Sequence, residues 1–315
     1  MFSSISSLLR LRRPESDTGE RTRAEAAFRP HGIRILRGPV ERHDVNFIFV
    51  CDAFPDSDKS WSGDLIENFP SARIFIYEYE IAQPSLAGIV DPQTLTENSL
   101  DLLRNLVKIC DAMTVPVVFF AHGFGGLLYE EAFVQSYGFG GSRERIHAAF
   151  LFGTPHFGAG IAEWAVIVAK LHGFHCAKTA QAQDWSSIKD KISWIATMQR
   201  KFREILNDSD SGPATIGCFS TLREPDSDLI IAPEWTVLPE FTPIAINRSH
   251  SSMTTLDQSD DALNAIKSII KQLVESKSIP TLGSSKRLAY EMPLNKADRS
   301  EPNPNKPSRP VDPQV

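Results

Sequence analysis

The chain has 315 residues, of which 42% are hydrophobic and 23% charged, and its formal net charge is −6. This balance is typical of a globular protein, and the length allows one large domain or two small ones. The excess positive charge lies at the two ends, where residues 1–30 and 279–315 each carry six basic and four acidic residues, so the middle is strongly acidic. An acidic body argues against a nucleic-acid-binding surface.

The two ends also differ from the middle in composition. Residues 1–13 contain Ser, Arg and apolar residues but no acid, a pattern that resembles a mitochondrial transit peptide. The alternative, which we expect, is the frayed basic end of a cytoplasmic protein. Residues 280–315 contain seven prolines and few apolar residues, so burial cannot offset the entropy of ordering them. We therefore predict a flexible segment over 1–30, one domain over 31–278 and a disordered Pro-rich tail over 279–315.

The cysteines and the apolar runs exclude two further classes of protein. The four cysteines are widely scattered and no two have the spacing of metal ligands, which indicates free thiols and neither a metal site nor a disulfide framework. We expect no cofactor. No apolar run approaches the roughly 18 residues that a membrane-spanning helix needs. The cysteines are Cys51, Cys110, Cys176 and Cys218.

Between the two ends, strand-like and helix-like segments alternate along the chain. The pattern predicts strands over 32–36, 46–50, 73–77, 115–120, 148–152, 215–219 and 242–246. It predicts helices over 96–113, 125–135, 161–171, 188–206 and 260–276. Such alternation favours an α/β fold, a mostly parallel sheet with helices on both faces, whose site lies at the carboxyl ends of the strands. Residues 157–214 are predicted to form a helical cap over this site.

The fourth predicted strand leads into the most informative motif. The sequence Ala121-His122-Gly123-Phe124-Gly125 occupies the place of the G-x-S-x-G nucleophile elbow, a sharp turn between a strand and a helix. The serine position is Gly123, so a hydrogen replaces the nucleophile. Glycine adopts the strained backbone of such a turn at little cost. The helix that starts near Phe124 directs N–H groups toward the cleft, where they favour an anionic group.

The ends of the second and fifth strands carry polar residues that suit other roles. Cys51 and Asp52 follow the second strand, where an oxyanion hole is expected, and a carboxylate there would repel a developing oxyanion. The alternative for Asp52 is an ordinary polar loop residue. His156 follows the fifth strand, which is too early for the chain order nucleophile, acid, histidine, so we interpret it as a structural histidine.

The last two strands should lead to the acid and the base. Thr221 lies where the acid is expected, and the nearby Glu224 and Asp226 are candidate substitutes or, alternatively, residues of a solvated loop. His250 follows the last strand and precedes the last helix, which is the place of the general base. Without a serine, this histidine can deprotonate only water or a bound ligand.

These segments resemble the serine esterases of the α/β-hydrolase superfamily, in particular the lipase-like domains of fungi. The likeness extends over about residues 30–275. It rests on 32–36, 45–50, Trp61, 69–75, 119–128, 150–158, Trp164 and 250–257. It implies an α/β-hydrolase fold with a Ser–acid–His site.

This chain departs from the family pattern at the site itself. The family's His-Gly after the second strand is Cys51-Asp52, its serine is Gly123 and its glutamate is Thr221, whereas its histidine is kept as His250. Two of the three triad positions and the oxyanion segment are therefore altered.

Three functions follow from this pattern. We expect a catalytically silent hydrolase fold that acts as a binding or interaction module, for a small acyl or anionic ligand or for a protein partner. The alternative is an enzyme that uses His250 as a base on an ester or acyl substrate, oriented by a nearby acid, or Cys51 as a displaced nucleophile. A dinucleotide-binding fold is disfavoured because the third glycine of G-x-G-x-x-G is Leu128 and the motif follows the fourth strand.

Overall fold

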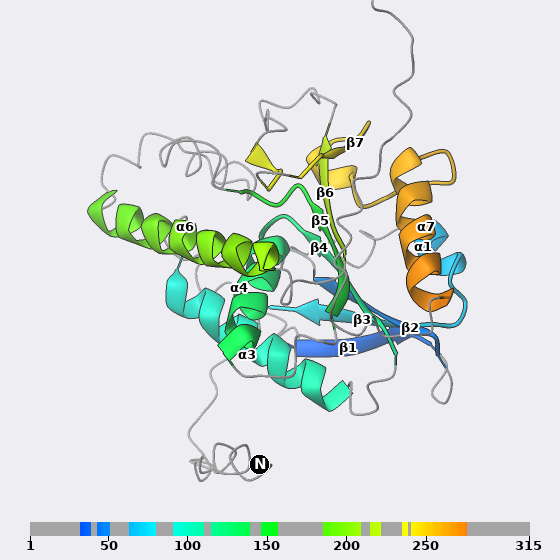
Figure 1. Cartoon of the computed structure of the whole chain (residues 1–315), viewed down its shortest axis with the longest axis horizontal. Helices are drawn as coiled ribbons and strands as arrows, with labels where there is room; N and C mark the ends of the chain where they lie inside the picture. Colours follow the sequence, from blue (N-terminus) through cyan, green and yellow to red (C-terminus); the bar gives the residue numbers. More distant parts are fainter. Residues whose placement is uncertain are drawn as a thin grey trace, which may run out of the picture. The chain divides into compact units, whose positions relative to one another are not determined.

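The structure is a computed structural model, and a seven-stranded sheet forms its centre (Figure 1). The strands are β1 (Gly32–Arg37), β2 (Val45–Val50), β3 (Ala72–Glu78), β4 (Val117–His122), β5 (Ile146–Phe152), β6 (Thr215–Thr221) and β7 (Ile244–Ile246). The structure describes residues 32–38, 43–50, 63–79, 91–109, 115–138, 146–156, 185–208, 215–221, 235–238 and 241–275.

The order and direction of the strands determine which edge of the sheet carries the candidate site. Across the sheet the order is β1-β3-β2-β4-β5-β6-β7, and every neighbouring pair is parallel except β1 with β3. The carboxyl ends of β2 and of β4 to β7 therefore lie along one edge. A mostly parallel sheet with helices on both faces and this strand order is the α/β-hydrolase architecture, as the sequence predicts.

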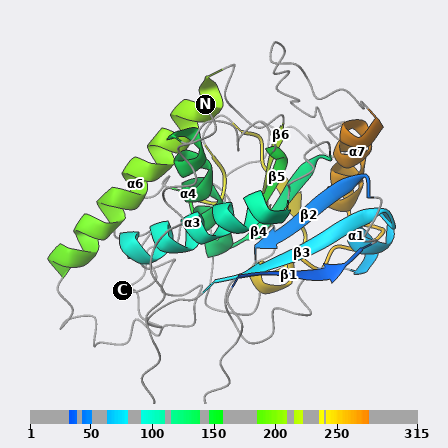
Figure 2. The same ribbon diagram turned by 90° about the horizontal axis from the view of Figure 1, so that it is seen from below.

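Helices cover both faces of the sheet (Figures 1 and 2). One face packs against α3 (Pro92–Ile109), α4 (Phe124–Gly138) and α6 (Trp185–Asn207), and the other against α1 (Gly63–Glu67) and α7 (Asp261–Glu275). The residues between the sheet and α3, α4 and α6 form the first core, and those between the sheet and α1 and α7 form the second. Side chains alternate along a strand, so in β2 Ile48 and Val50 belong to the first core and Phe47 and Phe49 to the second. Burial on both faces explains why β2 and β4 read as continuous apolar runs and not as alternating patterns.

The last helix shows how the periodic pattern becomes packing. In α7, Leu263, Ile266 and Ile270 are fully buried, and Ile269 and Leu273 pack at the margin of the same core. These five residues form the apolar stripe of the predicted helix over 260–276. Burying three such side chains stabilises the helix on the sheet by roughly 1.5–3 kcal/mol each.

The predicted elements match the structure with small shifts at their ends. All seven predicted strands and four of the five predicted helices are present; the fifth, over 161–171, lies outside the described residues. The largest shift is at α3, which starts four residues earlier than predicted. Asp91 accepts a hydrogen bond from the Thr94 backbone N–H at 3.0 Å and Pro92 takes the first helical position, a standard helix start.

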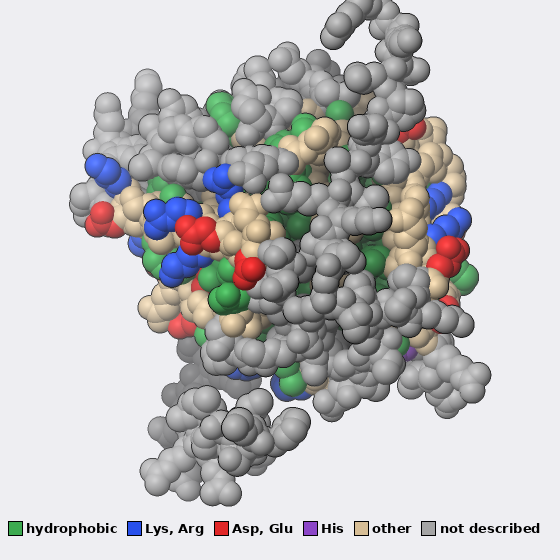
Figure 3. All heavy atoms as spheres, in the orientation of Figure 1, with side chains coloured by type: hydrophobic (Ala, Val, Ile, Leu, Met, Phe, Trp, Pro, Cys, Tyr) green, Lys and Arg blue, Asp and Glu red, His purple; other side chains and the backbone are tan. Residues whose placement is uncertain are grey.

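Part of the predicted cap range can be described. α6 packs against α4, where the Phe202 ring contacts those of Tyr129 and Phe133. Its outer side carries charged residues (Figure 3). Residues 157–184 lie outside the described part of the chain, as do the segments 1–31 and 276–315. In the described residues, no helix has the length and apolar character needed to span a membrane.

Candidate functional site

The turn after β4 has the geometry of an elbow. β4 ends at His122, Gly123 has φ +55°, and α4 begins at Phe124. The Gly123 N–H donates to the Phe152 carbonyl at 2.9 Å, and the Gly126 N–H donates to the Gly123 carbonyl at 3.1 Å. A left-handed backbone at this point costs a glycine little. The structure thus places a glycine at the sharp strand-to-helix turn that the motif predicts.

Two more glycines let α4 approach the ends of the neighbouring strands. A Cβ on Gly125 would lie 2.5 Å from the Val50 carbonyl oxygen, and a Cβ on Gly126 would lie 1.9 Å from Thr154 Oγ1. Both distances are far below van der Waals contact. Gly125 and Gly126 therefore allow close packing at this edge, whereas Gly123 forms the turn itself.

His250 lies at the same edge, on the short helix η5 (His250–Ser252) that follows β7. Its ring stacks on the ring of His122, with centroids 4.5 Å apart and planes inclined by 30°. His122 Nε2 is 3.1 Å from the His250 carbonyl oxygen. The predicted base is therefore in contact with the residue that precedes Gly123.

A second left-handed glycine supports His250. Gly153, directly after β5, has φ +56°, and a Cβ at this position would lie 2.4 Å from His250 Nδ1 and 2.9 Å from Met253 Sδ. Its N–H donates to the Phe219 carbonyl at 2.9 Å. Sequence reasoning missed this role of Gly153, and the only local signal is a glycine directly after a strand.

Thr221, at the predicted acid position, makes a contact that a carboxylate cannot make. It is the last residue of β6, and its hydroxyl donates to the Arg248 carbonyl. An ionised carboxylate only accepts hydrogen bonds, so an acid here would face that carbonyl oxygen with a second acceptor. Thr221 thereby fastens the loop that leads from β7 to His250.

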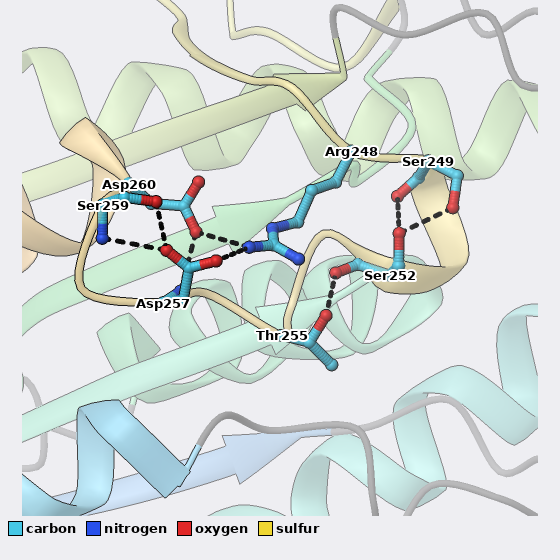
Figure 4. Close-up of polar contacts among 7 residues, drawn as sticks. All are labelled: Arg248, Ser249, Ser252, Thr255, Asp257, Ser259 and Asp260. Carbon is cyan, nitrogen blue, oxygen red and sulfur yellow. Dashed lines mark hydrogen bonds and ion pairs between the residues drawn. The ribbon is translucent and has the colours of Figure 1, made fainter.

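The Arg248 side chain organises the far end of this loop (Figure 4). Its guanidinium binds Asp257 and Asp260, the latter at 2.9 Å. Asp260 also accepts the Asp257 N–H at 2.7 Å, and Asp257 accepts the Ser259 N–H at 2.8 Å. Burial alone would lower the pKa of Arg248, but Asp260 and Asp257 outweigh it and raise the pKa.

Three hydroxyls stabilise the part of the loop next to His250 (Figure 4). Ser249 Oγ and Ser252 Oγ are 2.7 Å apart, and Thr255 Oγ1 donates to the Ser252 carbonyl at 2.6 Å. The Ser252 and Thr255 side chains are therefore both used in local hydrogen bonds.

His156, four residues after the end of β5, belongs to a buried charged cluster with Glu130 of α4. Its Nδ1 lies 3.0 Å from Glu130 Oε1, and both side chains are at most 1% exposed. These two atoms are not aligned as a hydrogen bond, so the attraction is mainly between charges. Gln199 of α6 donates to Glu130 at 3.1 Å and to the Pro155 carbonyl at 3.0 Å. Burial alone would lower the pKa of His156, but Glu130, assisted by Cys218, raises it to about 9.

The remaining predicted site residues are Cys51, Asp52, Glu224 and Asp226, and all four lie outside the described residues. Phe124, the first residue of α4, is 4% exposed and packs in the core on the α3, α4 and α6 face of the sheet. Within the described ranges, no three His, Cys, Asp or Glu side chains are grouped so that they could hold a metal ion. Among the described residues, Cys218 of β6 is a buried free thiol.

Comparison with known proteins gives structural neighbours only. No protein family profile matches the sequence, and no curated protein matches it. An esterase from Rhodococcus sp. ECU1013 aligns at 11% identity and TM-score 0.40, over 78% of this chain and 94% of the esterase. The RedJ thioesterase of Streptomyces coelicolor aligns at 13% identity and TM-score 0.41, over 75% of this chain and 91% of the thioesterase. A hydrolase from Oleispira antarctica aligns at 15% identity and TM-score 0.42, over 77% of this chain and 94% of the hydrolase.

Proposed function

We propose that this chain is a hydrolase-like protein that binds a small acyl or anionic ligand without hydrolysing it by serine chemistry. The observation that carries the proposal is Gly123, a residue with no side chain at the turn between β4 and α4. Triad residues act as a unit, and removal of the serine alone lowers kcat by about 10⁶-fold in a well-studied protease. A protein of this type retains the shape of the site and not its nucleophile.

The acid position supports the same proposal. The Thr221 hydroxyl is engaged with the Arg248 carbonyl, so it does not supply the negative charge that would stabilise an imidazolium. The positive end of the α4 dipole lies at the same edge of the sheet and favours an anionic group of a ligand. Together these features favour binding over acyl transfer.

A second candidate function is base catalysis by His250 alone. The contact between His250 and His122 keeps an imidazole beside the elbow. With Glu224 or Asp226 as the orienting acid, this imidazole would activate water or a bound ester. We rank this function second because a water molecule must replace the positioned nucleophile.

Labelling with a fluorophosphonate, together with hydrolysis of short-chain esters, tests the proposal on the full chain. We expect no labelling of the wild-type protein and labelling of Gly123→Ser, which restores a hydroxyl at the turn. The double variant Gly123→Ser/His250→Ala is the matched control and should stay unlabelled. Strong labelling of the wild type that is lost in His250→Ala would overturn the proposal in favour of the second candidate.

The binding half of the proposal needs its own measurement. We expect decanoate to raise the midpoint of thermal unfolding of the wild-type protein. The matched control is decyltrimethylammonium, which has the same chain length and the opposite charge. Equal shifts with both compounds would indicate nonspecific detergent binding and contradict a site for an anionic acyl ligand.

A further inference from the structure

His122 makes a contact with His250 that the elbow motif does not account for. It is the last residue of β4 and is 8% exposed. Its Nε2 lies 3.1 Å from the His250 carbonyl oxygen. A carbonyl oxygen only accepts hydrogen bonds, so this Nε2 carries the hydrogen and donates it. The geometry therefore requires a hydrogen on Nε2 of His122.

The acceptor of this hydrogen bond is the carbonyl of His250 itself, the first residue of η5. The Met253 N–H also approaches the His250 carbonyl, at 3.5 Å, which is a weak contact. The donor from His122 is the shorter of the two and comes from β4, the strand that precedes Gly123. This hydrogen bond joins the start of η5 to the turn after β4, although the two segments are 128 residues apart in the sequence.

Two independent contacts thus position the His250 ring. The ring stacks on His122 with centroids 4.5 Å apart. It also lies so close to Gly153 that an added Cβ would be 2.6 Å from Cε1. One contact comes from the end of β4 and the other from the end of β5, so the two strand ends jointly define where the imidazole lies.

We infer that His122 is a positioning residue that orients His250 through a main-chain hydrogen bond and ring stacking. This inference rests on the proposed function in one respect, that the edge beside Gly123 is the binding site. It adds that the edge beside Gly123 carries two stacked imidazoles, one of which donates its Nε2–H to the main chain of the other.

Nitrogen NMR of the ¹⁵N-histidine-labelled full chain tests this inference without a ligand or a reaction. We expect Nε2 of His122 to carry a hydrogen that exchanges slowly with solvent. His122→Phe keeps an aromatic ring but removes the donor, and it should shift and broaden the His250 signals. His122→Gln keeps a donor and should restore the His250 signals in part.

The outcomes separate this inference from the proposed function. An Nδ1–H tautomer of His122, or His250 signals that are identical in the wild type and His122→Phe, would overturn it. The tautomer is read on the wild type, so poor folding of a variant does not remove the test. Labelling of wild-type protein by a fluorophosphonate would overturn the proposed function and leave the role of His122 in place.

Discussion

Gly153 and His250 approach each other so closely that no side chain fits between them. A Cβ at position 153 would lie 2.4 Å from Nδ1 of the imidazole. Gly153 also has a left-handed backbone, which L side chains rarely adopt. Both constraints require glycine here, and Gly153 in turn limits where the His250 imidazole lies.

Gly153→Ala should therefore both destabilise the protein and displace His250. We expect a loss of about 1–3 kcal/mol from backbone strain, with a further loss from the clash, measured by urea denaturation. Gly32→Ala is the matched control, since Gly32 has φ +110° and its added Cβ would meet nothing closer than 3.9 Å. Equal losses in the two variants would contradict the clash.

Position 126 offers a test of how tightly α4 packs on the loop after β5. The Cβ of Gly126→Ala would overlap the Thr154 side chain, and we expect a loss of about 1–3 kcal/mol for such overpacking. Adding Thr154→Ala removes Oγ1 and Cγ2, the two closest atoms, and should recover part of the loss. A double-mutant cycle from urea denaturation with no coupling between the two sites would refute the overlap.

The buried pair of His156 and Glu130 should make stability depend on pH. The folded pKa of His156 is raised to about 9, above the ordinary value near 6.5, so the stabilisation is complete below about pH 6.5. It is lost as the pH rises through 9, and its size is on the order of 3 kcal/mol.

Urea denaturation between pH 6 and 10 measures this loss. His156→Gln removes the titrating group and should flatten the dependence on pH in that window. Glu130→Gln should flatten it as well, because it removes the charge that raises the pKa. A wild-type slope that survives in both variants would assign the titration to other groups.

Thr221 should contribute through its hydroxyl alone. Thr221→Val keeps the shape and leaves the Arg248 carbonyl without this donor, and we expect a loss of about 1 kcal/mol. Hydrogen exchange should also become faster in the loop over 247–260. Thr221→Ser keeps the hydroxyl and is the control. A valine variant as stable as the wild type would show that the hydrogen bond makes no net contribution.

Local patterns were sufficient to predict the sheet and the elbow. The continuous apolar runs of β2, β4 and β5 arise because both faces of the sheet are buried, and such runs are readable in sequence. The turn at Gly123 follows from a strand, a glycine and a helical pattern in succession. The start of α3 was also readable from Asp91 and Pro92 but was predicted four residues too late.

The contacts of the candidate site could not be predicted in the same way. The Thr221–Arg248 bond depends on the register of β6 on β7, where Thr221 lies opposite Ile246. The approach of Gly153 to His250 depends on how the ends of β5 and β7 lie relative to each other. Hydrophobic patterns define which face of a strand is buried, but a contact between distant segments requires the three-dimensional arrangement.

Two of the hydrogen bonds that join neighbouring strand ends involve the main chain only. The Gly123 N–H donates to the Phe152 carbonyl, and the Gly153 N–H donates to the Phe219 carbonyl. Each turn is thus held by the strand beside it, independently of any reactive side chain. The main-chain frame of this edge is therefore separate from the side chain at residue 123, and one substitution there would place a hydroxyl at the turn.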